Sequence, residues 1–319
     1  MQTTRKKKRF DVSPKPYNSF GDYLNKKYSG QILKLPINAG FSCPNRDGKI
    51  SFGGCIFCAE DGSASPSALS QFDVITQMNT AKEGFKRSSK TSIKYIAYFQ
   101  AFTNTYNTRE NLKLLYDLAV TQEDIIGLMI ATRPDCLQDD VIDLIAEYAK
   151  DNFELWVELG MQSSHNKSLD YLNRGHNFDC TKDAIIRLAD KNIPVCTHII
   201  LGIPQETWDD MMYTANVLAE LPIAGIKFHQ MHIIKNTRLA QIHNDNPIPQ
   251  ISMKEYVSYI CDFLERTRKN ILIHRLTGDR DAGTLIAPLW GLHKGSIQKA
   301  ISDEFEKRGT HQGFLIGEY

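Results

Sequence analysis

The sequence predicts an α/β fold, a partial (β/α)6 TIM-type barrel with a small C-terminal extension. Near-continuous apolar and β-branched runs carry this prediction, because such runs are typical of parallel strands covered on both faces. They lie at residues 31–37, 93–99, 127–132, 155–161, 195–202 and 226–234. Helical segments separate them, and this alternation indicates a parallel sheet with crossover helices. The sequence has no dinucleotide-binding glycine fingerprint, which favours a partial barrel over a doubly wound sheet.

The helices are predicted from apolar residues at helical spacing and from capping patterns. Leu112, Leu115 and Ala119 recur on one helical face, as expected for a helix packed on a sheet. Ser252 and Glu255 have the spacing of a capping box ahead of a later apolar face, so we expect a helix to begin there.

We expect three parts in the chain. Residues 1–30 form a basic N-terminal linker, residues 31–250 form the barrel core, and residues 251–319 form a C-terminal extension that packs on the barrel. The extension contains the run ILIHRL and a last helix near 295–308, which we expect to close one side of the barrel.

Composition excludes several classes of protein. The 319 residues are 42% hydrophobic and 24% charged, which is close to ordinary globular usage and unlike disordered or collagen-like chains. A net charge of +1 excludes a wholesale polyanion binder but leaves room for local basic patches. The sequence shows no membrane-length apolar run and no signal peptide at its start. We therefore expect a cytoplasmic protein with no membrane partner.

One loop concentrates cysteine, glycine and proline directly after the first predicted strand. Cys43 is followed by eleven residues and Cys55, then by two residues and Cys58. Barrels of this class build their active sites at the carboxyl ends of their strands, so the loop stands where catalysis is expected.

The three thiols of this loop allow several metal chemistries. A disulfide would leave one thiol over and conflicts with a reducing compartment. A structural zinc needs a fourth ligand, and the next cysteine and the first histidine are the distant Cys136 and His165. An iron–sulfur cubane normally takes four cysteines. Three would leave one iron open, as in catalytic sites. Zinc with a distant fourth ligand stays an alternative.

The other four cysteines are scattered singly through helix- and strand-like segments. They are Cys136, Cys180, Cys196 and Cys261. In a reducing compartment such residues behave as small buried hydrophobes. Their spacing offers no second cluster, so we predict one cluster only.

The cysteine loop and the motifs at later strand ends resemble the radical S-adenosylmethionine superfamily, over roughly residues 15 to 290. The resemblance is to the branch with a long first spacing, which includes the elongator-type tRNA-modifying enzymes. It implies one [4Fe–4S] cluster held by Cys43, Cys55 and Cys58, with S-adenosylmethionine chelating the open iron. It also implies a 5′-deoxyadenosyl radical that takes a hydrogen atom from the substrate. An external reductant of the flavodoxin or ferredoxin type would supply the electron.

Two further motifs follow the second and third predicted strands. Gln100, Thr103 and Asn104 stand where the superfamily usually has a Gly-Gly-Glu motif for the methionine amino group. The resemblance therefore implies cofactor contacts there, and a plain polar loop is the alternative. Arg133 lies in ATRPDCL, which is similar to a segment of the elongator-type enzymes. It would hold a carboxylate or a phosphate, or it is an ion-paired or solvated arginine.

The fourth and fifth predicted strands carry the remaining cofactor motifs. Glu158 and Gln162 in ELGMQS share one face of a strand. The resemblance implies hydrogen bonds from them to the cofactor ribose, and a buried structural acid is the alternative. Gly202 and Pro204 belong to GIPQE, which is similar to an adenine-contacting motif. An ordinary strand-to-helix turn is the alternative there.

Substrate-side residues are predicted from the last strands. On the sixth strand Lys227, His229 and Met231 alternate with Phe228, Gln230 and His232, and either set faces the barrel mouth or packs the barrel. A polar rim is expected from His274, Arg275 and Asp279.

Within the superfamily the chain resembles the YhcC/YtqA-type (MnmL-like) proteins. That resemblance implies tRNA as substrate, with wobble 5-carboxymethylaminomethyl-uridine converted to 5-aminomethyl-uridine. The basic run from Arg5 to Arg9, with Lys15, Lys26 and Lys27, either grips phosphates or is a solvated tail. The alternatives are radical chemistry on a different RNA or small molecule, or a non-catalytic, metal-stapled RNA-binding module.

Overall fold

The computed structural model describes residues 15–62, 72–86 and 93–316 of the protein. The basic run from Arg5 to Arg9 lies outside these residues, and the division of the chain into three parts stays a prediction.

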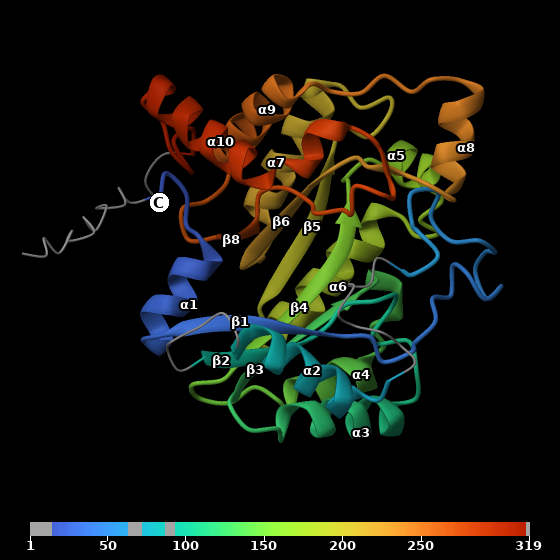
Figure 1. The fold of residues 1–319 in the computed structure, drawn as a ribbon, viewed down its shortest axis with the longest axis vertical. Helices are drawn as coiled ribbons and strands as arrows, with labels where there is room; N and C mark the ends of the chain where they lie inside the picture. Colours follow the sequence, from blue (N-terminus) through green and yellow to red (C-terminus); the bar gives the residue numbers. More distant parts are fainter. Residues whose placement is uncertain (1–14, 63–71, 87–92, 317–319) are drawn as a thin grey trace, which may run out of the picture.

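A single curled sheet of parallel strands forms the centre of the molecule (Figure 1). The strand order follows the chain, as β1-β2-β3-β4-β5-β6-β8. The bounds are β1 Gln31–Ile37, β2 Ile93–Phe99, β3 Ile125–Thr132, β4 Glu154–Gln162, β5 Val195–Leu201, β6 Gly225–Gln230 and β8 Leu272–Arg275. Every neighbouring pair is parallel. The two edge strands β1 and β8 do not pair with each other, so the predicted partial barrel is confirmed.

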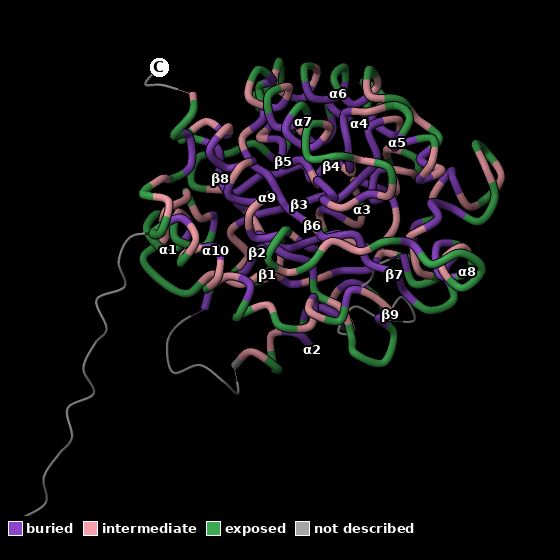
Figure 2. Tube along the Cα trace, turned by 90° about the horizontal axis from the view of Figure 1, so that it is seen from above, coloured by how far each residue is buried: buried purple, intermediate pink, exposed green. Residues whose placement is uncertain are grey.

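Helices cover the outer face of this sheet. They are α2 Val74–Lys86, α3 Arg109–Val120, α4 Asp139–Ala146, α6 Phe178–Asp190 and α7 Trp208–Glu220. Outward-facing strand residues such as Leu128 and Val157 are fully buried. The outward-facing Phe228 packs edge-on against Phe263 of helix α9, Met253–Glu265. Figure 2 shows the strands as the buried centre of the molecule and the helices as its more exposed shell. Because both faces of the strands are covered, their sequences read as apolar runs.

Inward-facing residues of the same strands change character along the barrel. Near the amino ends they are apolar or aromatic, as with Met129 and Trp156. Helix α1, Phe20–Tyr28, closes this end: the Phe20 ring stacks on His274 with centroids 3.8 Å apart and meets Trp156 edge-on at 5.3 Å. Towards the carboxyl ends polar side chains replace them, including Glu158. The amino end is therefore filled mainly by apolar and aromatic side chains, where the buried Glu154 pairs with Lys27 of α1 at 2.5 Å, and the carboxyl end is polar.

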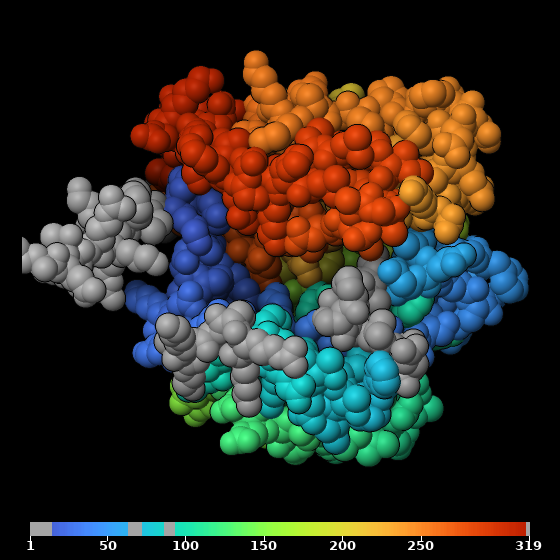
Figure 3. Space-filling model, viewed as in Figure 1, coloured from blue at the N-terminus to red at the C-terminus, as the bar shows by residue number. Residues whose placement is uncertain are grey.

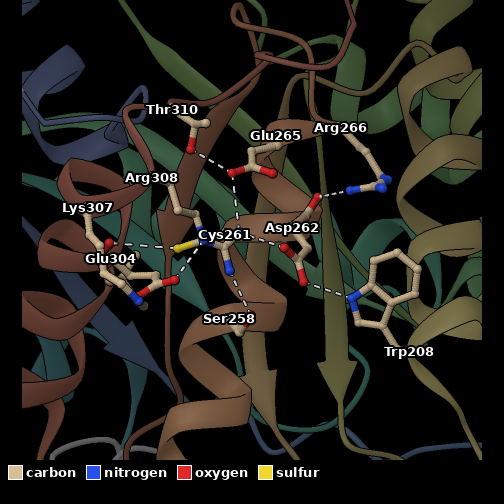
Figure 4. Close-up of polar contacts among 11 residues, drawn as sticks. Trp208, Ser258, Cys261, Asp262, Glu265, Arg266, Glu304, Lys307, Arg308 and Thr310 are labelled. Atoms are coloured by element: carbon tan, nitrogen blue, oxygen red, sulfur yellow. Dashed lines mark hydrogen bonds and ion pairs between the residues drawn. The ribbon is translucent and has the colours of Figure 1, made fainter.

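Residues 251–316 contribute two α-helices and β8, the seventh strand of the main sheet. Helix α9, Met253–Glu265, begins with the predicted capping box, in which Ser252 Oγ accepts from Glu255 N–H at 3.2 Å. The predicted last helix is α10, Lys294–Arg308. Arg308 joins the two helices through acidic residues of α9, as Figure 4 shows.

The end of the predicted sixth strand differs from the sequence expectation. Residues 226–234 divide into β6 and a separate strand β7, Ile233–Ile234, which pairs antiparallel with β9, Leu285–Ala287. The run ILIHRL forms β8 and joins the main sheet beside β6. The division of β6 from β7 and the place of β8 both depend on pairing with residues distant in the sequence, which local periodicity cannot predict.

The remaining helical elements connect these strands. They are α5 Asn166–Tyr171, α8 Arg238–Asp245 and the short 3-10 helices η1 Pro134–Cys136 and η2 Leu289–Leu292. None of the helices in the described part of the chain has the length and apolar character needed to cross a membrane.

Candidate active site

A cavity of about 530 Å³ opens at the carboxyl ends of the strands. Residues of β2, β3, β4, β5, β6 and β8 line it, together with the end of the cysteine loop. Figure 3 shows a hollow between the C-terminal segments, in orange and red, and the N-terminal segments, in blue and cyan. The strand-end layer forms the mouth of the cavity, and mid-strand residues such as Glu158 and Lys227 form its floor.

The cysteine loop makes one tight turn directly after Cys43 and a second between Cys55 and Cys58. Arg46 N–H donates to Cys43 carbonyl at 2.8 Å, and Cys58 N–H donates to Cys55 carbonyl at 3.0 Å. Gly53 and Gly54 have φ of 79° and 81°, a conformation that favours glycine. The three thiols are free, with Cys55 buried and the other two half-buried.

Two side chains donate hydrogen bonds to the Cys55 sulfur. Arg174 Nη1 lies 3.2 Å from Cys55 Sγ, and Asn45 Nδ2 lies 3.5 Å from the same atom. Arg174 also donates to Gly160 carbonyl at 2.6 Å, which ties the loop to strand β4. No local motif marks Arg174, because it reaches the loop only through the fold. Asn45 lies in the loop itself, but only the folded loop shows its contact with the sulfur.

Arg46 binds the loop from the other side. Its guanidinium donates to the carbonyls of Cys58 at 3.0 Å, Ala59 at 2.5 Å and Glu60 at 3.3 Å. Burial raises the pKa of the Cys58 thiol, as does the neighbouring Cys55, while Arg46 offsets part of this rise. A thiolate at this position is therefore stabilised by a cation held within the loop.

These residues fit an iron–sulfur cluster. Three thiols lie on one loop, N–H donors point at a sulfur, and two guanidinium groups are available to balance thiolate charge. The cavity wall also has buried polar atoms without protein partners, Arg133 Nη1 and Arg174 Nε. Such atoms are expected where a polar cofactor completes the hydrogen bonding.

Four of the predicted cofactor residues line the cavity together: Gln100, Arg133, Glu158 and Gln162. Gln162 adopts φ of 71° where the β4–β5 register shifts. Backbone strain of this kind in a non-glycine residue is concentrated at functional sites. The structure thus brings together motifs that stand 62 residues apart in the chain, from Gln100 to Gln162.

Three other predicted residues lie outside the cavity lining. Asn104 is fully buried, and its amide donates to Ala131 carbonyl at 2.8 Å. Gly202 has φ of 82°, and a Cβ there would lie 2.8 Å from the Ile251 side chain. Pro204 follows in the same strand-to-helix turn. A cofactor contact by any of the three stays a prediction.

Arg133 is an ion-paired arginine in which one nitrogen has no hydrogen-bond partner among the residues that the structure describes. Its Nε and Nη2 donate to the Asp135 carboxylate at 2.8 and 2.7 Å, and Nη2 also donates to Arg174 carbonyl at 2.6 Å. Nη1 is buried without a partner. The ion pair fixes the plane of the guanidinium group and leaves Nη1 to donate to a ligand.

Glu158 is the acidic centre of the cavity floor. Its Oε2 accepts from Tyr98 Oη at 2.5 Å and from Lys227 Nζ at 2.7 Å, and lies 2.8 Å from His198 Nε2. Burial alone would raise the pKa of Glu158, but Lys227 and Lys34 lower it well below its ordinary value. The carboxylate is therefore ionised and strongly held.

A three-residue group on this floor has the side-chain types of a metal site. Glu158, Cys196 and His274 bring their ligand atoms within 4.8 Å of one another. Lys227 Nζ lies 2.7 Å and Lys34 Nζ 3.4 Å from the same carboxylate. Two adjacent cations oppose the binding of a metal cation, so this group does not form a metal centre.

The predicted substrate-side residues separate in the structure. Lys227, His229 and Arg275 line the cavity. His274 lies deeper, against Phe20. Asp279 lies at the rim, where it forms an ion pair with Lys294 at 2.7 Å.

Comparison with known proteins identifies the family to which this architecture belongs. Residues 43–218 match the Radical SAM superfamily, and residues 223–307 match the Radical_SAM C-terminal domain. YtqA of Bacillus subtilis (strain 168) is 39% identical over 95% of this chain and 94% of its own length. YhcC of Escherichia coli (strain K12) is 35% identical over 94% of this chain and 95% of its own.

More distant similarities concern tRNA-modifying proteins. A tRNA-2-methylthio-N(6)-dimethylallyladenosine synthase of Fusobacterium nucleatum is 27% identical over 49% of this chain and 37% of its own length. The structure of Elp3 from Methanocaldococcus infernus superposes with a TM-score of 0.66 at 16% identity, over 89% of this chain and 64% of that chain. At this identity the superposition supports the fold.

Proposed function

Because this chain belongs to the radical S-adenosylmethionine superfamily, we propose that it modifies the wobble uridine of tRNA, converting 5-carboxymethylaminomethyl-uridine to 5-aminomethyl-uridine. The protein is a radical enzyme with a [4Fe–4S] cluster and S-adenosylmethionine as cofactors. Membership of this enzyme family leaves the non-catalytic RNA-binding alternative without support.

The cysteine loop is the observation that carries the radical chemistry of this proposal. Cys43, Cys55 and Cys58 would hold the cluster, and Arg174 and Asn45 would hydrogen-bond to its Cys55 ligand. When bound, the cluster and S-adenosylmethionine supply one-electron chemistry that removes a hydrogen atom from the substrate. The protein itself holds the thiolates and encloses the reacting groups in a cavity.

S-Adenosylmethionine would lie across the strand-end layer. Gln100, Arg133 and Gln162 line the cavity at this level and have the polar groups that its methionine and ribose parts require. Gly202 and Pro204 would shape the turn against the adenine. The predicted ribose contact of Glu158 stays a prediction, and its hydrogen bond with Lys227 favours a role in positioning that lysine.

The tRNA substrate is supported by the tRNA-modifying relatives. A one-electron reductant of the flavodoxin or ferredoxin type would serve the cluster. The second candidate, a radical reaction on a different RNA or on a small molecule, has the same catalytic part and differs only in what enters the cavity.

Nucleoside mass spectrometry of tRNA from a deletion strain tests the substrate. We expect 5-carboxymethylaminomethyl-uridine to accumulate, with restoration by the wild-type gene and by Cys180→Ala but not by Cys58→Ala. Cys180 is the matched control because it is a half-buried cysteine on α6, outside the loop. Unchanged wobble nucleosides in the deletion strain would exclude this substrate.

Anaerobic reconstitution tests the chemistry separately. Wild-type and Cys180→Ala proteins should bind about four irons per chain and form 5′-deoxyadenosine after reduction, whereas Cys58→Ala should not. Equal product from Cys58→Ala would contradict the assignment of the cluster ligands.

A further inference from the structure

The floor of the cavity carries more positive than negative charge. Three cations act on one carboxylate, Glu158: Lys227 and Arg275 line the cavity, and Lys34 reaches the carboxylate from beside the lining. Lys227 and Lys34 both pair with that carboxylate, at 2.7 and 3.4 Å. Glu158 can balance one of the three charges, so the floor has an excess of two.

A register shift between β6 and β8 places Arg275 in this group. Ile226 lies opposite Ile273, but Lys227 lies opposite Arg275, so His274 is an extra residue on β8. A β-bulge of this kind changes the direction in which the following side chain points, compared with its direction under regular pairing. As a result Arg275 stands beside Lys227 and lines the cavity.

Arg275 has no acidic partner among the described residues. Its Nη2 contacts the His229 ring, 2.8 Å from Nδ1, and its Nε is buried without a hydrogen-bond partner. Asp279, four residues further on, pairs with Lys294 at 2.7 Å instead. A guanidinium withdrawn from water normally has a carboxylate or phosphate beside it.

The neighbours of Arg275 cannot supply the missing negative charge. Burial, and next the charge of Arg275, lower the pKa of His229 well below its ordinary value, so the ring is neutral. Burial likewise lowers the pKa of Lys227 to about 8, although Glu158 opposes this. No side chain that the structure describes beside Arg275 therefore offsets the excess of positive charge at the cavity floor.

We propose that Arg275, with His229 and Lys227 beside it, binds a carboxylate group of the substrate at the cavity floor. The inference rests on the proposed function in one respect: the substrate shares this cavity with S-adenosylmethionine. A guanidinium fork and a lysine match the two oxygens of a carboxylate. The wobble substrate proposed above carries such a group on its uridine side chain.

A terminal carboxylate fits the site better than a backbone phosphate. The floor lies mid-strand, below the strand-end layer, and Glu158 and Lys227 are buried there. A phosphodiester has a nucleoside on each side and would need room for both, whereas a carboxylate ends its chain. The carboxylate of S-adenosylmethionine is the other source, and the experiment separates the two.

The direct test measures binding of a small carboxylate to the holoenzyme with S-adenosylmethionine bound. The probe is N-ethylglycine, and its primary amide, which lacks the carboxylate, and inorganic phosphate serve as comparison ligands. Binding is measured as the ligand-dependent rise of the thermal unfolding midpoint. We expect N-ethylglycine to bind the wild type better than either comparison ligand, and Arg275→Gln to weaken it by about tenfold to a hundredfold.

Two further variants control this measurement. Arg275→Lys keeps the charge without the fork and should retain part of the affinity. Arg266→Gln removes an arginine that lies over the Trp208 ring, outside the cavity lining, and should bind the probe as the wild type does. Full affinity in Arg275→Gln, or phosphate bound as tightly as N-ethylglycine, would overturn the proposal.

The second readout is turnover of an anticodon stem-loop carrying 5-carboxymethylaminomethyl-uridine. Arg275→Gln should raise KM for this RNA by about tenfold or more, and 5′-deoxyadenosine formation without RNA is measured beside it. Loss of that RNA-free activity would show that Arg275 serves the cofactor carboxylate instead. Arg275-dependent probe binding without any turnover of the stem-loop would contradict the proposed wobble reaction and leave the carboxylate site standing.

Discussion

Two arginines of this molecule have opposite surroundings, although both lie in the C-terminal part of the chain. Arg308 on α10 donates to Asp262 at 2.6 Å and to Glu304 at 2.8 Å, and reaches Glu265 at 3.3 Å (Figure 4). Arg275 on β8 has no carboxylate partner among the described residues and faces the cavity. The first arginine is neutralised by the helices it joins, and the second is left for a ligand to neutralise.

The pKa shifts of the two guanidinium groups have opposite signs. Burial lowers the pKa of Arg308, but its hydrogen bonds to Glu304 and Asp262 raise it by more. For Arg275, burial dominates and the pKa falls below its ordinary value. A shift in this direction for a cation at a cavity is typical of a functional site. The difference teaches that local neutralisation separates a structural arginine from a binding one.

The largest effect is expected from removing the one carboxylate of the floor. Glu158→Gln leaves Lys227, Lys34 and Arg275 without a negative charge, so we expect the free energy of unfolding to fall by about 3–5 kcal/mol. Urea denaturation of the cluster-free protein measures it. Glu304→Gln is the control: it removes one of several acids around Arg308 and should cost about 1 kcal/mol or less. Similar losses for the two variants would contradict the proposed difference between the clusters.

Much of the barrel was predictable from the sequence. Strands β1 and β2 occupy the predicted residues 31–37 and 93–99, because parallel strands buried on both faces leave continuous apolar runs that local pattern reports. The strand-end positions of Gln100 and Gln162 followed from the predicted second and fourth strands, and both line the cavity.

The parts that could not be predicted depend on pairing between distant segments. Arg174 reaches Cys55 from 119 residues away, and no local motif marks it. The extra residue His274 in β8 is defined only against the register of β6. Sequence reasoning placed Arg275 at the polar rim, but its lack of an acidic partner is visible only when every neighbouring strand is in place.

The second prediction concerns the structural arginine. Arg308→Gln leaves Asp262, Glu265 and Glu304 close together without their shared cation, and each is less than one quarter exposed. We expect a loss of about 2 kcal/mol in the free energy of unfolding. KM for the stem-loop and 5′-deoxyadenosine formation should stay unchanged. A raised KM in this variant would mean that the C-terminal helices contribute to the substrate site.

The third prediction uses pH to change the charge of the floor. Lys227 has its pKa lowered from 10.5 to about 8, so it is charged below pH 8 and loses its proton above it. We expect kcat/KM for the carboxylate-bearing stem-loop to fall by about tenfold between pH 7 and pH 9. The charged and titratable groups around it are Glu158, Tyr98, His198, His229, Lys34 and Arg275.

Lys227→Arg provides the control for this pH profile. Its guanidinium stays charged over the whole range, so the decline above pH 8 should disappear even if the absolute rate is lower. A decline of the same size in Lys227→Arg would assign the titration to another group.

The smallest effect is expected for the stability of Arg275→Gln, and its sign is the sharpest distinction between the two arginines. Removing one of the three cations around Glu158 relieves repulsion between like charges in a poorly solvated site. Without substrate, the free energy of unfolding should therefore rise by about 0.5–1 kcal/mol, in line with functional sites that lower stability. Urea denaturation beside Arg308→Gln measures it. A loss as large as that of Arg308→Gln would show that Arg275 is held by the protein as Arg308 is, and the distinction would fail.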